Sequence, residues 1–403
     1  MSVARGKATD FSCVTMKNMT MKGANFLEKL LDNQPVEWKK LGEVCDIKTG
    51  KGVTKKDAVE DGVYPIISGG KTPMDYIDKY NRVANTVTVS RVGANAGYVN
   101  YLGEKFYLND KCFSVIPKID YIDSKFLYYI LKAREQQITA MQSLGGVPTI
   151  NTSKVGSIEI PLPPLSVQSR IVEILDKFTS LEAELEAELE LRKKQYAYYR
   201  EQLLNFSYTP PSEFNVVYRK LGGGAQYSKG RIDASTLSAK NYVGVDNLLQ
   251  DCQGKKLSEH VPTEGRCTAY SPKDILIGNI RPYLKKIWFA DNAGGTNGDV
   301  LVIQTTDERV LPKYLYQVLS DDAFFTYDMQ HAKGAKMPRG NKDKILDYKI
   351  PLPPLSEQQR IVEILDKFDT LTNSISEGLP LEIQLRRQQY EYYREQLLAF
   401  PHP

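Results

Sequence analysis

Apolar residues in two stretches of the chain recur at alternating spacings of three and four residues. This spacing places them on one face of an α-helix and is typical of a coiled-coil seam. The first seam consists of Ile171, Ile174, Phe178, Leu181, Leu185, Leu189, Tyr196, Tyr199 and Leu203. The second consists of Ile361, Ile364, Phe368, Leu371, Ile375, Leu379, Ile383, Tyr390, Tyr393 and Leu397.

A helix of about 40 residues would be roughly 60 Å long and would expose its seam if it stood alone. Two similar seams in one chain therefore predict a pair of long antiparallel helices. Two helices in separate bundles are the alternative. Gly378 and Pro380 lie within the second seam. Because proline removes a backbone donor and clashes with the preceding turn, we expect a kink or break near residues 376–380.

The two seams lie in duplicated sequence. IPLPPLSVQSRIVEILDKF (160–178) matches IPLPPLSEQQRIVEILDKF (350–368) at seventeen of nineteen positions, and QYAYYREQLLNF (195–206) matches QYEYYREQLLAF (389–400) at ten of twelve. The prolines predict a turn before each helix. Ser166 and Ser356 are candidate N-caps, and Gln359 would complete a capping box with Ser356. A ligand for an SH3-type domain is the alternative interpretation of PLPP, but the helix start directly after it favours the turn.

The segments before each repeat share a fainter plan. Residues 63–68, 85–92, 274–280 and 299–304 have the composition of strands bounded by turn residues. Residues 125–141 and 313–329 have helical patterns, and glycine-containing loops follow at 144–150 and 334–341. We therefore predict an α+β fold with two related domains separated by two long antiparallel coiled-coil helices, as a pseudo-two-fold internal repeat. The expected parts are a flexible leader (1–25), domain 1 (26–160), a turn and central helix (161–212), domain 2 (213–350), and a turn and C-terminal helix (351–403).

Composition and charge narrow the class of protein. Hydrophobic residues make up 41% and charged residues 25%, which is ordinary for a globular protein. No apolar run is long enough to cross a membrane, and no signal peptide is visible. Five scattered cysteines and three histidines do not predict a zinc site, and they fit a reducing cytoplasm.

Positive charge lies in the two variable segments. Residues 36–160 contain 17 Lys and Arg against 14 Asp and Glu, and residues 213–350 contain 20 against 16. The repeated segments 161–212 and 351–403 are acidic, with 6 against 8 and 5 against 8. A polyanion would therefore meet the variable segments, although each imbalance is modest.

No catalytic motif is complete. The PLPPLS segments lack the polar first residue and the aromatic residue of the tetrapeptide found in DNA amino-methyltransferases. SGGKT (68–72) resembles a phosphate loop, but the required first glycine is Pro65. No nuclease, serine hydrolase or zinc protease pattern is present. These absences argue against an enzyme that is active alone.

Basic residues on glycine-rich loops are the candidates for DNA contact. Arg and Lys neutralise phosphates or bond guanine, and Asn can pair with adenine in the major groove. The candidates in the first variable segment are Lys51, Lys55, Lys56, Lys71, Arg91 and Asn95. Those in the second are Lys229, Arg231, Arg281, Tyr283, Lys285, Lys333, Lys336 and Arg339. Arg91, Arg281 and Arg339 are favoured, and for each lysine a solvated surface charge is the alternative.

The duplicated motifs, placed after two diverged domains, strongly resemble the specificity subunit of type I restriction-modification systems. The resemblance covers the chain after about residue 26. It implies two target-recognition domains, each recognising half of a split double-stranded DNA target. It also implies that the helices set the spacing and dock two modification subunits. Residues assigned to this spacer and docking role are Phe178, Leu181, Leu185, Tyr199, Phe368, Leu371, Ile375 and Tyr393.

The resemblance further implies that the chain is not itself an enzyme and binds no cofactor. S-adenosylmethionine, ATP and Mg²⁺ would belong to the modification and restriction subunits. Two other functions stay open at this point. One is a coiled-coil spacer that presents two protein-binding domains, and the other is an enzyme whose site no motif marks.

Overall fold

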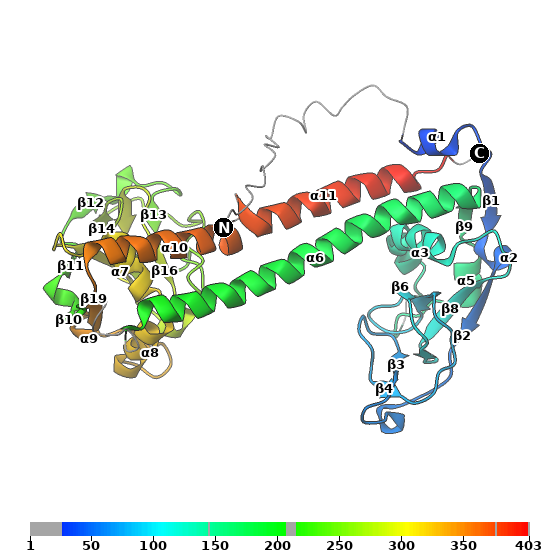
Figure 1. Ribbon diagram of the computed structural model, residues 1–403, viewed down its shortest axis with the longest axis horizontal. Helices are drawn as coiled ribbons and strands as arrows, with labels where there is room; N and C mark the ends of the chain where they lie inside the picture. The colour runs from blue at the N-terminus through cyan, green and yellow to red at the C-terminus, as the bar shows by residue number, and fades with distance from the viewer. Residues whose placement is uncertain (1–25, 144–145, 207–214, 375–376, 402–403) are drawn as a thin grey trace, which may run out of the picture. The chain divides into compact units, whose positions relative to one another are not determined.

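The computed structural model describes residues 26–143, 146–206, 215–374 and 377–401, so the leader 1–25 and Ile375 lie outside the described residues. The chain divides into two compact units (Figure 1). Unit 1 comprises Met1–Ala183 with Leu385–Pro403, and unit 2 comprises Glu184–Gln384. Each unit thus combines one variable segment with parts of both repeated segments.

Each unit contains the same four-stranded antiparallel sheet. In unit 1 its order is β2 (Cys45–Thr49), β8 (Cys112–Pro117), β5 (Thr86–Ser90) and β6 (Val99–Leu102). In unit 2 it is β11 (Ala225–Tyr227), β18 (Val300–Thr305), β15 (Ile275–Gly278) and β16 (Ile287–Phe289). The register is also the same, because Val87 faces Val115 as Ile275 faces Ile303. The strands predicted at 85–92, 274–280 and 299–304 are confirmed as β5, β15 and β18.

Helices cover this sheet and complete its core. The helical pattern 125–141 forms two helices, α3 (Ser124–Ala133) and α4 (Glu135–Ala140), and 313–329 forms α7 (Pro312–Leu319) and α8 (Asp322–His331). The predicted helical character of both ranges is therefore confirmed, with a break in each. The break in unit 2 falls where the Asp321 side chain accepts a hydrogen bond from Ala323 N and starts a new helix.

The second sheet differs between the units. In unit 1 it has three strands in the order β4 (Tyr76–Ile77), β3 (Tyr64–Ile67) and β7 (Tyr107–Leu108). In unit 2 it has four, in the order β12 (Arg231–Asp233), β14 (Arg266–Tyr270), β17 (Gly294–Thr296) and β13 (Tyr242–Val243). The strand predicted at 63–68 is confirmed as β3.

Short helices connect these strands. Unit 1 contains α1 (Phe26–Leu31), α2 (Leu41–Val44), η1 (Lys55–Asp57) and α5 (Thr152–Gly156). Unit 2 contains η3 (Leu221–Gly223), η4 (Ala234–Thr236), η5 (Pro282–Leu284) and α9 (Lys342–Asp347). The core of unit 1 also includes Leu27 and Leu31 from α1, packed with Leu397 and Phe400 near the end of the chain.

A two-stranded sheet closes each domain. β1 (Glu37–Lys40) pairs with β9 (Glu159–Leu162), and β10 (Val217–Lys220) pairs with β19 (Lys349–Leu352). Pro161 faces Trp38, and Pro351 faces Tyr218. The prediction that these prolines form a turn is therefore wrong for the first half of IPLPPLS. Proline is tolerated here because each strand of a two-stranded sheet is an edge strand.

The long helices begin two residues earlier than predicted. α6 runs over Leu165–Leu204, and α10 runs over Leu355–Asn373. Ser166 and Ser356 therefore lie inside the helices, and the residue that caps α10 is Pro354, which makes no side-chain cap bond. The predicted N-caps and the capping box with Gln359 are wrong.

Gln168 and Gln358, two glutamines not predicted, fix each helix start instead. Gln168 Nε2 donates to Pro163 O (2.8 Å) and Tyr121 O (2.9 Å), and its Oε1 accepts from Asp123 N (2.9 Å). Gln358 repeats the pattern, donating to Pro353 O and Arg309 O and accepting from Leu311 N. Both side chains are buried, with 0% and 1% exposure. Each glutamine therefore joins a long helix to the loop that precedes α3 or α7.

The predicted pairing of the two seams is visible inside each unit. In unit 1 the Phe178 ring stacks on Tyr393, with 5.3 Å between centroids. In unit 2 the Phe368 ring stacks on Tyr199 at 5.5 Å. Phe178 and Phe368 are equivalent in the repeat, as are Tyr199 and Tyr393, so the two contacts are copies of each other. Leu181, Leu185 and Leu371 are half-buried on the same helices.

The second long helix is interrupted where the sequence predicts it. α10 ends at Asn373, and α11 runs over Gly378–Leu398. Gly378 has a φ of 80°, and a side chain there would lie against the carbonyl oxygens of Thr370 and Leu371. Pro380 falls in the first turn of α11, where a missing N–H is tolerated. Over the described residues, no helix is both long and apolar enough to cross a membrane.

Candidate nucleic-acid interface

In unit 2, residues 279–285 and 333–341 form a paired frame of two loops. Arg281 N donates to Pro338 O (2.7 Å), and Gly340 N donates to Asn279 O (3.2 Å). The second loop is closed by Lys333 and Arg339, whose backbone groups bond each other in both directions at 2.8 Å. The frame therefore brings three of the predicted residues, Arg281, Lys333 and Arg339, onto one backbone scaffold with exposed side chains.

Arg281 adopts a backbone conformation that is unfavourable for its residue type. Its φ is 52°, and the φ of Lys285 is 48°, so two left-handed residues bracket η5. Such conformations cost roughly 1 kcal/mol or more for residues with a Cβ and persist where surrounding contacts hold them. The bonds from Arg281 N to Pro338 O and from Leu284 N to Arg281 O hold this one. The turn leaves the Tyr283 side chain 51% exposed.

Two other cationic side chains of this region, Arg339 and Lys285, differ in their exposure and in how far an ion pair compensates their charge. Arg339 pairs with Asp299 (3.0 Å) while its side chain stays 55% exposed. Lys285 pairs with Asp322 (2.7 Å) and is half-buried. The hydrogen bond from Lys285 to Asp322 raises the pKa of this lysine. Arg339 can therefore reach a ligand while keeping its ion pair, whereas the charge of Lys285 is compensated within the protein.

Unit 1 contains the same frame with other side chains. Gly93 N donates to Pro148 O (2.9 Å), and Ile150 N donates to Arg91 O (2.8 Å). By these bonds Arg91 takes the place of Asn279, and Gly93 takes the place of Arg281. Gly93 also has a positive φ, 96°. Unit 2 thus carries an arginine at a left-handed position where unit 1 has the residue that adopts it without strain.

Arg91 is less free than the sequence suggests. Its guanidinium carbon lies 5.4 Å from the centroid of the Phe113 ring, and Nη1 donates to Asp110 O at 3.3 Å. Its Nε is buried without a hydrogen-bond partner among the described residues. The side chain is therefore held against the domain and presents only part of its guanidinium.

Asn95 lies on the same loop as Arg91, and Lys71 lies on the 68–72 loop, which contacts it. Asn95 Nδ2 donates to Gly69 O (3.0 Å), which ties the 91–97 loop to the 68–72 loop. Lys71 Nζ lies 5.9 Å from the Tyr98 ring centroid. Asn95 thus uses a donor inside the protein, while Lys71 is exposed.

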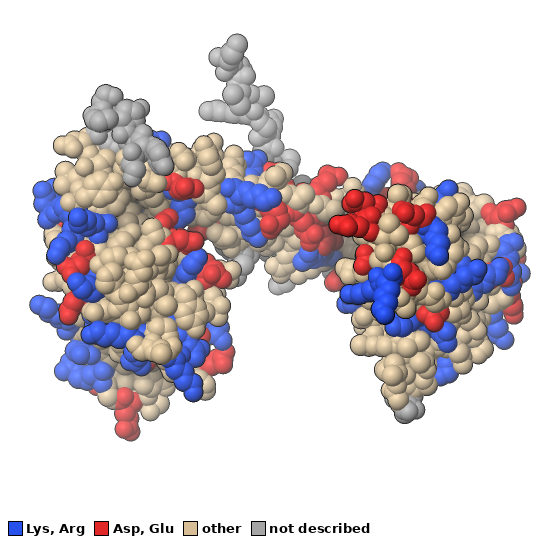
Figure 2. Space-filling view, turned by 90° about the horizontal axis from the view of Figure 1, so that it is seen from below, with Lys and Arg blue, Asp and Glu red and all other residues tan. Residues whose placement is uncertain are grey.

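The remaining predicted residues are exposed, and all of them except Lys336 lie outside the two loops of the frame. Lys51 follows β2, Lys55 and Lys56 lie in η1, and Lys336 lies within the 333–341 loop. Lys229 and Arg231 flank Gly230 at the start of β12, where Arg231 Nη1 donates to Thr268 Oγ1 (3.2 Å). Figure 2 shows Lys and Arg side chains interspersed with Asp and Glu over the visible face of the molecule.

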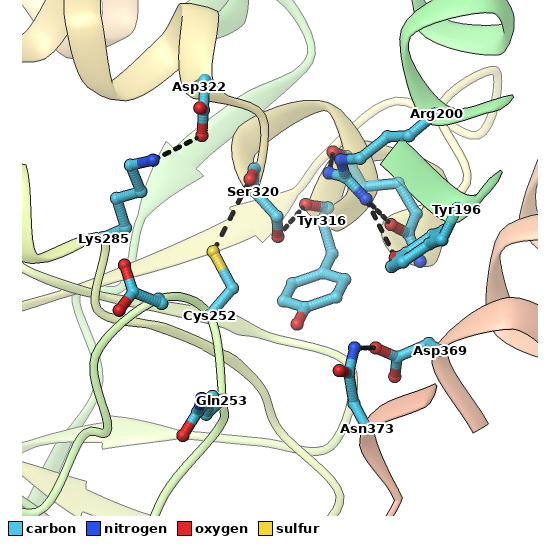
Figure 3. Close-up of a pocket in the computed structure, with 12 residues that line it drawn as sticks. Tyr196, Arg200, Cys252, Gln253, Lys285, Tyr316, Ser320, Asp322, Asp369 and Asn373 are labelled. Carbon is cyan, nitrogen blue, oxygen red and sulfur yellow. Dashed lines mark hydrogen bonds and ion pairs between the residues drawn. The ribbon is translucent and has the colours of Figure 1, made fainter. Parts of the chain in front are cut away.

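A cavity of about 220 Å³ in unit 2 lies between α6, α10 and the loop around Cys252 (Figure 3). Arg200 bonds Tyr196 Oη (3.2 Å) and both oxygens of Gln317. Lys285 pairs with Asp322, so both cations that line the cavity are engaged. Burial raises the pKa of the Cys252 thiol to about 11, which keeps it protonated and poorly nucleophilic at neutral pH. We interpret this cavity as a gap in the packing between the long helices α6 and α10 and the domain of unit 2.

No three His, Cys, Asp or Glu side chains of the described residues converge as metal ligands would. The glutamines Gln168 and Gln358 and the frame residues Asn279 and Gly340 were missed by sequence reasoning. The glutamines had a signal: each is a polar residue on the buried face of a helix start and is identical in both copies. The sequence contains no signal for the frame residues Asn279 and Gly340, because their equivalence to residues of unit 1 depends on backbone pairing between distant loops.

The chain matches the family model described as "Type I restriction modification DNA specificity domain" twice, over residues 33–191 and 219–385. It is 32% identical over 409 residues to the type I restriction enzyme EcoR124I/EcoR124II specificity subunit of Escherichia coli, covering 95% of this chain and 99% of that one. It is 35% identical over 399 residues to a putative type I restriction enzyme specificity subunit of Haemophilus influenzae, covering 93% and 98%. The crystal structure of a type I restriction-modification S subunit from M. genitalium has the same fold, with a TM-score of 0.63, 17% identity and coverage of 92% and 98%.

Proposed function

The chain belongs to the family of type I restriction-modification DNA specificity subunits. From this premise, we propose that its two recognition domains recognise different halves of one DNA target. Unit 1 recognises one half of a bipartite double-stranded DNA target, and unit 2 recognises the other. The repeated helices dock two adenine-modifying subunits, and restriction subunits join through them. The observation that carries this proposal is the paired loop frame, which has the same backbone bonds but different side chains in the two units.

The frame supports recognition of two different half-sites. Equivalent positions carry Arg91 and Asn279, Gly93 and Arg281, and Thr149 and Arg339. Arginine pairs bidentately with guanine in the major groove, so unit 2 has two exposed arginines where unit 1 has Gly93 and Thr149. A common backbone with different donors would bring DNA to the same place in each unit and favour different bases there. The exposed lysines on other loops would contact phosphates without regard to sequence.

The repeated helices support docking of identical partners. Tyr198 and Tyr392 are equivalent and are 60% and 54% exposed. Leu165 and Leu355 are also equivalent and are 42% and 44% exposed. Apolar side chains that stay identical in both copies while exposed fit a surface that meets the same partner twice. The stacked pair Phe178–Tyr393 in unit 1 and the stacked pair Phe368–Tyr199 in unit 2 serve the helix pair itself.

The length of α6 sets the separation of the two half-sites in this proposal. Deleting one four-residue unit from residues 182–189 would shorten the helix by about 6 Å. The preferred gap between half-sites would change, while the half-sites themselves would not. Catalysis and the binding of S-adenosylmethionine, ATP and Mg²⁺ belong to the partner subunits.

Methylation mapping of DNA in cells with and without this gene tests the proposal. The expected result is a methylated bipartite motif that depends on the gene. In vitro, the chain with its modification subunits should enrich the same motif from a random duplex pool, with binding that weakens steeply as salt rises. Retention of the pool without any enrichment would overturn the recognition function and favour a spacer with protein-binding domains. Methyl transfer by the chain alone would favour an enzyme.

A further inference from the structure

Two buried polar side chains of unit 2 have oxygens without hydrogen-bond partners among the described residues. Both carboxylate oxygens of Asp328 lack a partner, and its side chain is 1% exposed. Asn279 is 7% exposed, and its Oδ1 also lacks a partner. Leaving such groups unpaired in a protein interior is energetically unfavourable, because they lose their hydrogen bonds to water and gain none in the protein. Their presence together therefore needs a physical explanation.

The two side chains converge on Gly340. A Cβ added to Gly340 would lie 2.6 Å from Asp328 Oδ1, 2.7 Å from Asn279 Oδ1 and 2.9 Å from Asp328 Oδ2. The three acceptor oxygens therefore surround one point beside the Gly340 backbone. Gly340 N in turn donates to Asn279 O, so the cluster lies directly beneath the frame that carries Arg281 and Arg339.

Unit 1 has an apolar side chain where unit 2 has Gly340. Ile150 takes the position of Gly340, because Ile150 N donates to Arg91 O as Gly340 N donates to Asn279 O. Ile150 is buried in the core of unit 1. The backbone bond is therefore common to both units, but a buried isoleucine in unit 1 corresponds to a glycine beside a polar cluster in unit 2.

We propose that Asp328 is a positioning residue for half-site recognition by unit 2, acting as a neutral acid that donates a hydrogen bond to Asn279 Oδ1 and so holds the Gly340 segment that presents Arg281 and Arg339. One proton on the carboxyl supplies the donor that the three oxygens lack. The bond links α8 to the end of β15, and Asn279 O holds Gly340 N in turn. The inference rests on the proposed function, and it names a residue that would not itself touch DNA.

The surroundings of Asp328 favour its protonated form. Burial raises the pKa of Asp328 to about 6, and the nearby His331 lowers it by a smaller amount. The other charged or titratable groups around the cluster are Tyr227 on β11, Asp343 on α9 and the Arg339–Asp299 ion pair. An acid with a raised folded-state pKa contributes stability at low pH, and this contribution is lost as pH rises through about 6. Above that pH, the charged carboxylate would loosen the frame.

The test measures how well the full chain, with its modification subunits, discriminates its own target from two duplexes at constant ionic strength. One duplex is altered in the half-site of unit 2, and the other is altered in the half-site of unit 1. Between pH 5.5 and 7.5, we expect discrimination at the unit 2 half-site to fall on the order of fivefold to tenfold, the value of one hydrogen bond. Discrimination at the unit 1 half-site should stay constant.

The decisive variant is Asp328→Asn, which can donate to Asn279 Oδ1 at every pH. We expect it to remove the pH dependence and to keep discrimination at its low-pH level. Asp343→Asn is the matched control, because it removes the same charge from an exposed position on α9 and should leave the wild-type slope unchanged.

Several outcomes would overturn the inference. One is an Asp328→Asn variant with the wild-type pH slope, and another is an equal flattening by Asp343→Asn. A third is weaker discrimination by Asp328→Asn at every pH, which would mean that the Asn279 amide donates to a charged carboxylate. Failure of the proposed function looks different, because no target would then be enriched at any pH.

Discussion

The two units share one sheet and one loop frame, and they differ in the second sheet and in the side chains placed on the frame. The shared parts have the same strand order, the same register and the same backbone bonds. The second sheets have three and four strands, and equivalent frame positions carry Gly93 and Arg281. The comparison indicates which parts hold the recognition surface in place and which parts can vary with the target.

Gln168 and Gln358, which join the long helices to the loops before α3 and α7, belong to the shared parts. Replacing one of them should therefore have the largest effect. Replacing Gln358 by Ala removes three hydrogen bonds and leaves Arg309 O, Pro353 O and Leu311 N without this partner. We expect a loss of about 3 kcal/mol in the stability of unit 2. Hydrogen exchange should show faster exchange in α7 and the start of α10, with unit 1 unchanged.

Gln168→Ala should have the mirror effect, confined to unit 1. The matched control is Gln359→Ala, next to Gln358 but exposed, where only an i,i+4 contact with Glu363 is lost. Its stability should change by less than about 0.5 kcal/mol. Equal destabilisation by the exposed and buried substitutions would contradict the role assigned to the glutamines.

Replacing Arg281, which has a positive φ, should affect DNA recognition without reducing the stability of the fold. Arg281→Gly gives unit 2 the residue that unit 1 has at the same place. We expect affinity for the target to fall by about 1–3 kcal/mol, with the loss specific to the unit 2 half-site. Thermal stability should be unchanged or slightly higher, because glycine adopts φ near 52° without strain. A variant that binds normally would remove Arg281 from the interface.

The duplicated tyrosines test the docking surface. Tyr198→Ser and Tyr392→Ser change exposed side chains, so each should leave stability within about 0.5 kcal/mol of the wild type. Each should weaken the binding of one modification subunit by about 1 kcal/mol, measured by calorimetry, and the double variant should weaken both. Tyr283→Ser, on the loop frame of unit 2, is the matched exposed control and should leave the binding of modification subunits unchanged. Normal binding by the double variant would place the docking surface elsewhere.

The exposed lysines of η1 should show the smallest effect. Lys55→Ala is expected to reduce affinity for all sequences alike and to lower the slope of log K against log salt by about 1. Sequence preference should not change. If Lys55→Ala altered the preferred bases, the residue would belong to base recognition and not to phosphate contact.

Local patterns in the sequence were enough to predict much of the fold. The seams, the strands at 63–68, 85–92, 274–280 and 299–304, and the interruption before Gly378 each depend on residues close together in the chain, and each is found. The strand in IPLP was not predictable in this way. Pro161 is tolerated because it pairs with Trp38, more than a hundred residues earlier, at an edge.

The candidate site shows the same limit. Residue types and glycine-rich loops were enough to nominate Arg281 and Arg339, but not to show that a loop frame joins them. The positive φ of Arg281 comes from its bond with Pro338, and the cluster of Asp328 with Asn279 depends on three separate segments. Such features follow from long-range packing, which a single sequence does not display.

The central claim is that each unit recognises its own half-site through a common frame. A chimera in which residues 37–162 are replaced by 217–352 of the same chain tests it most directly, because both junctions fall at equivalent positions of β1, β9, β10 and β19. With the partner subunits present, methylation mapping should then yield a symmetric motif in which the unit 2 half-site occurs twice in inverted orientation. An unchanged asymmetric motif from a folded, methylating chimera would contradict the claim.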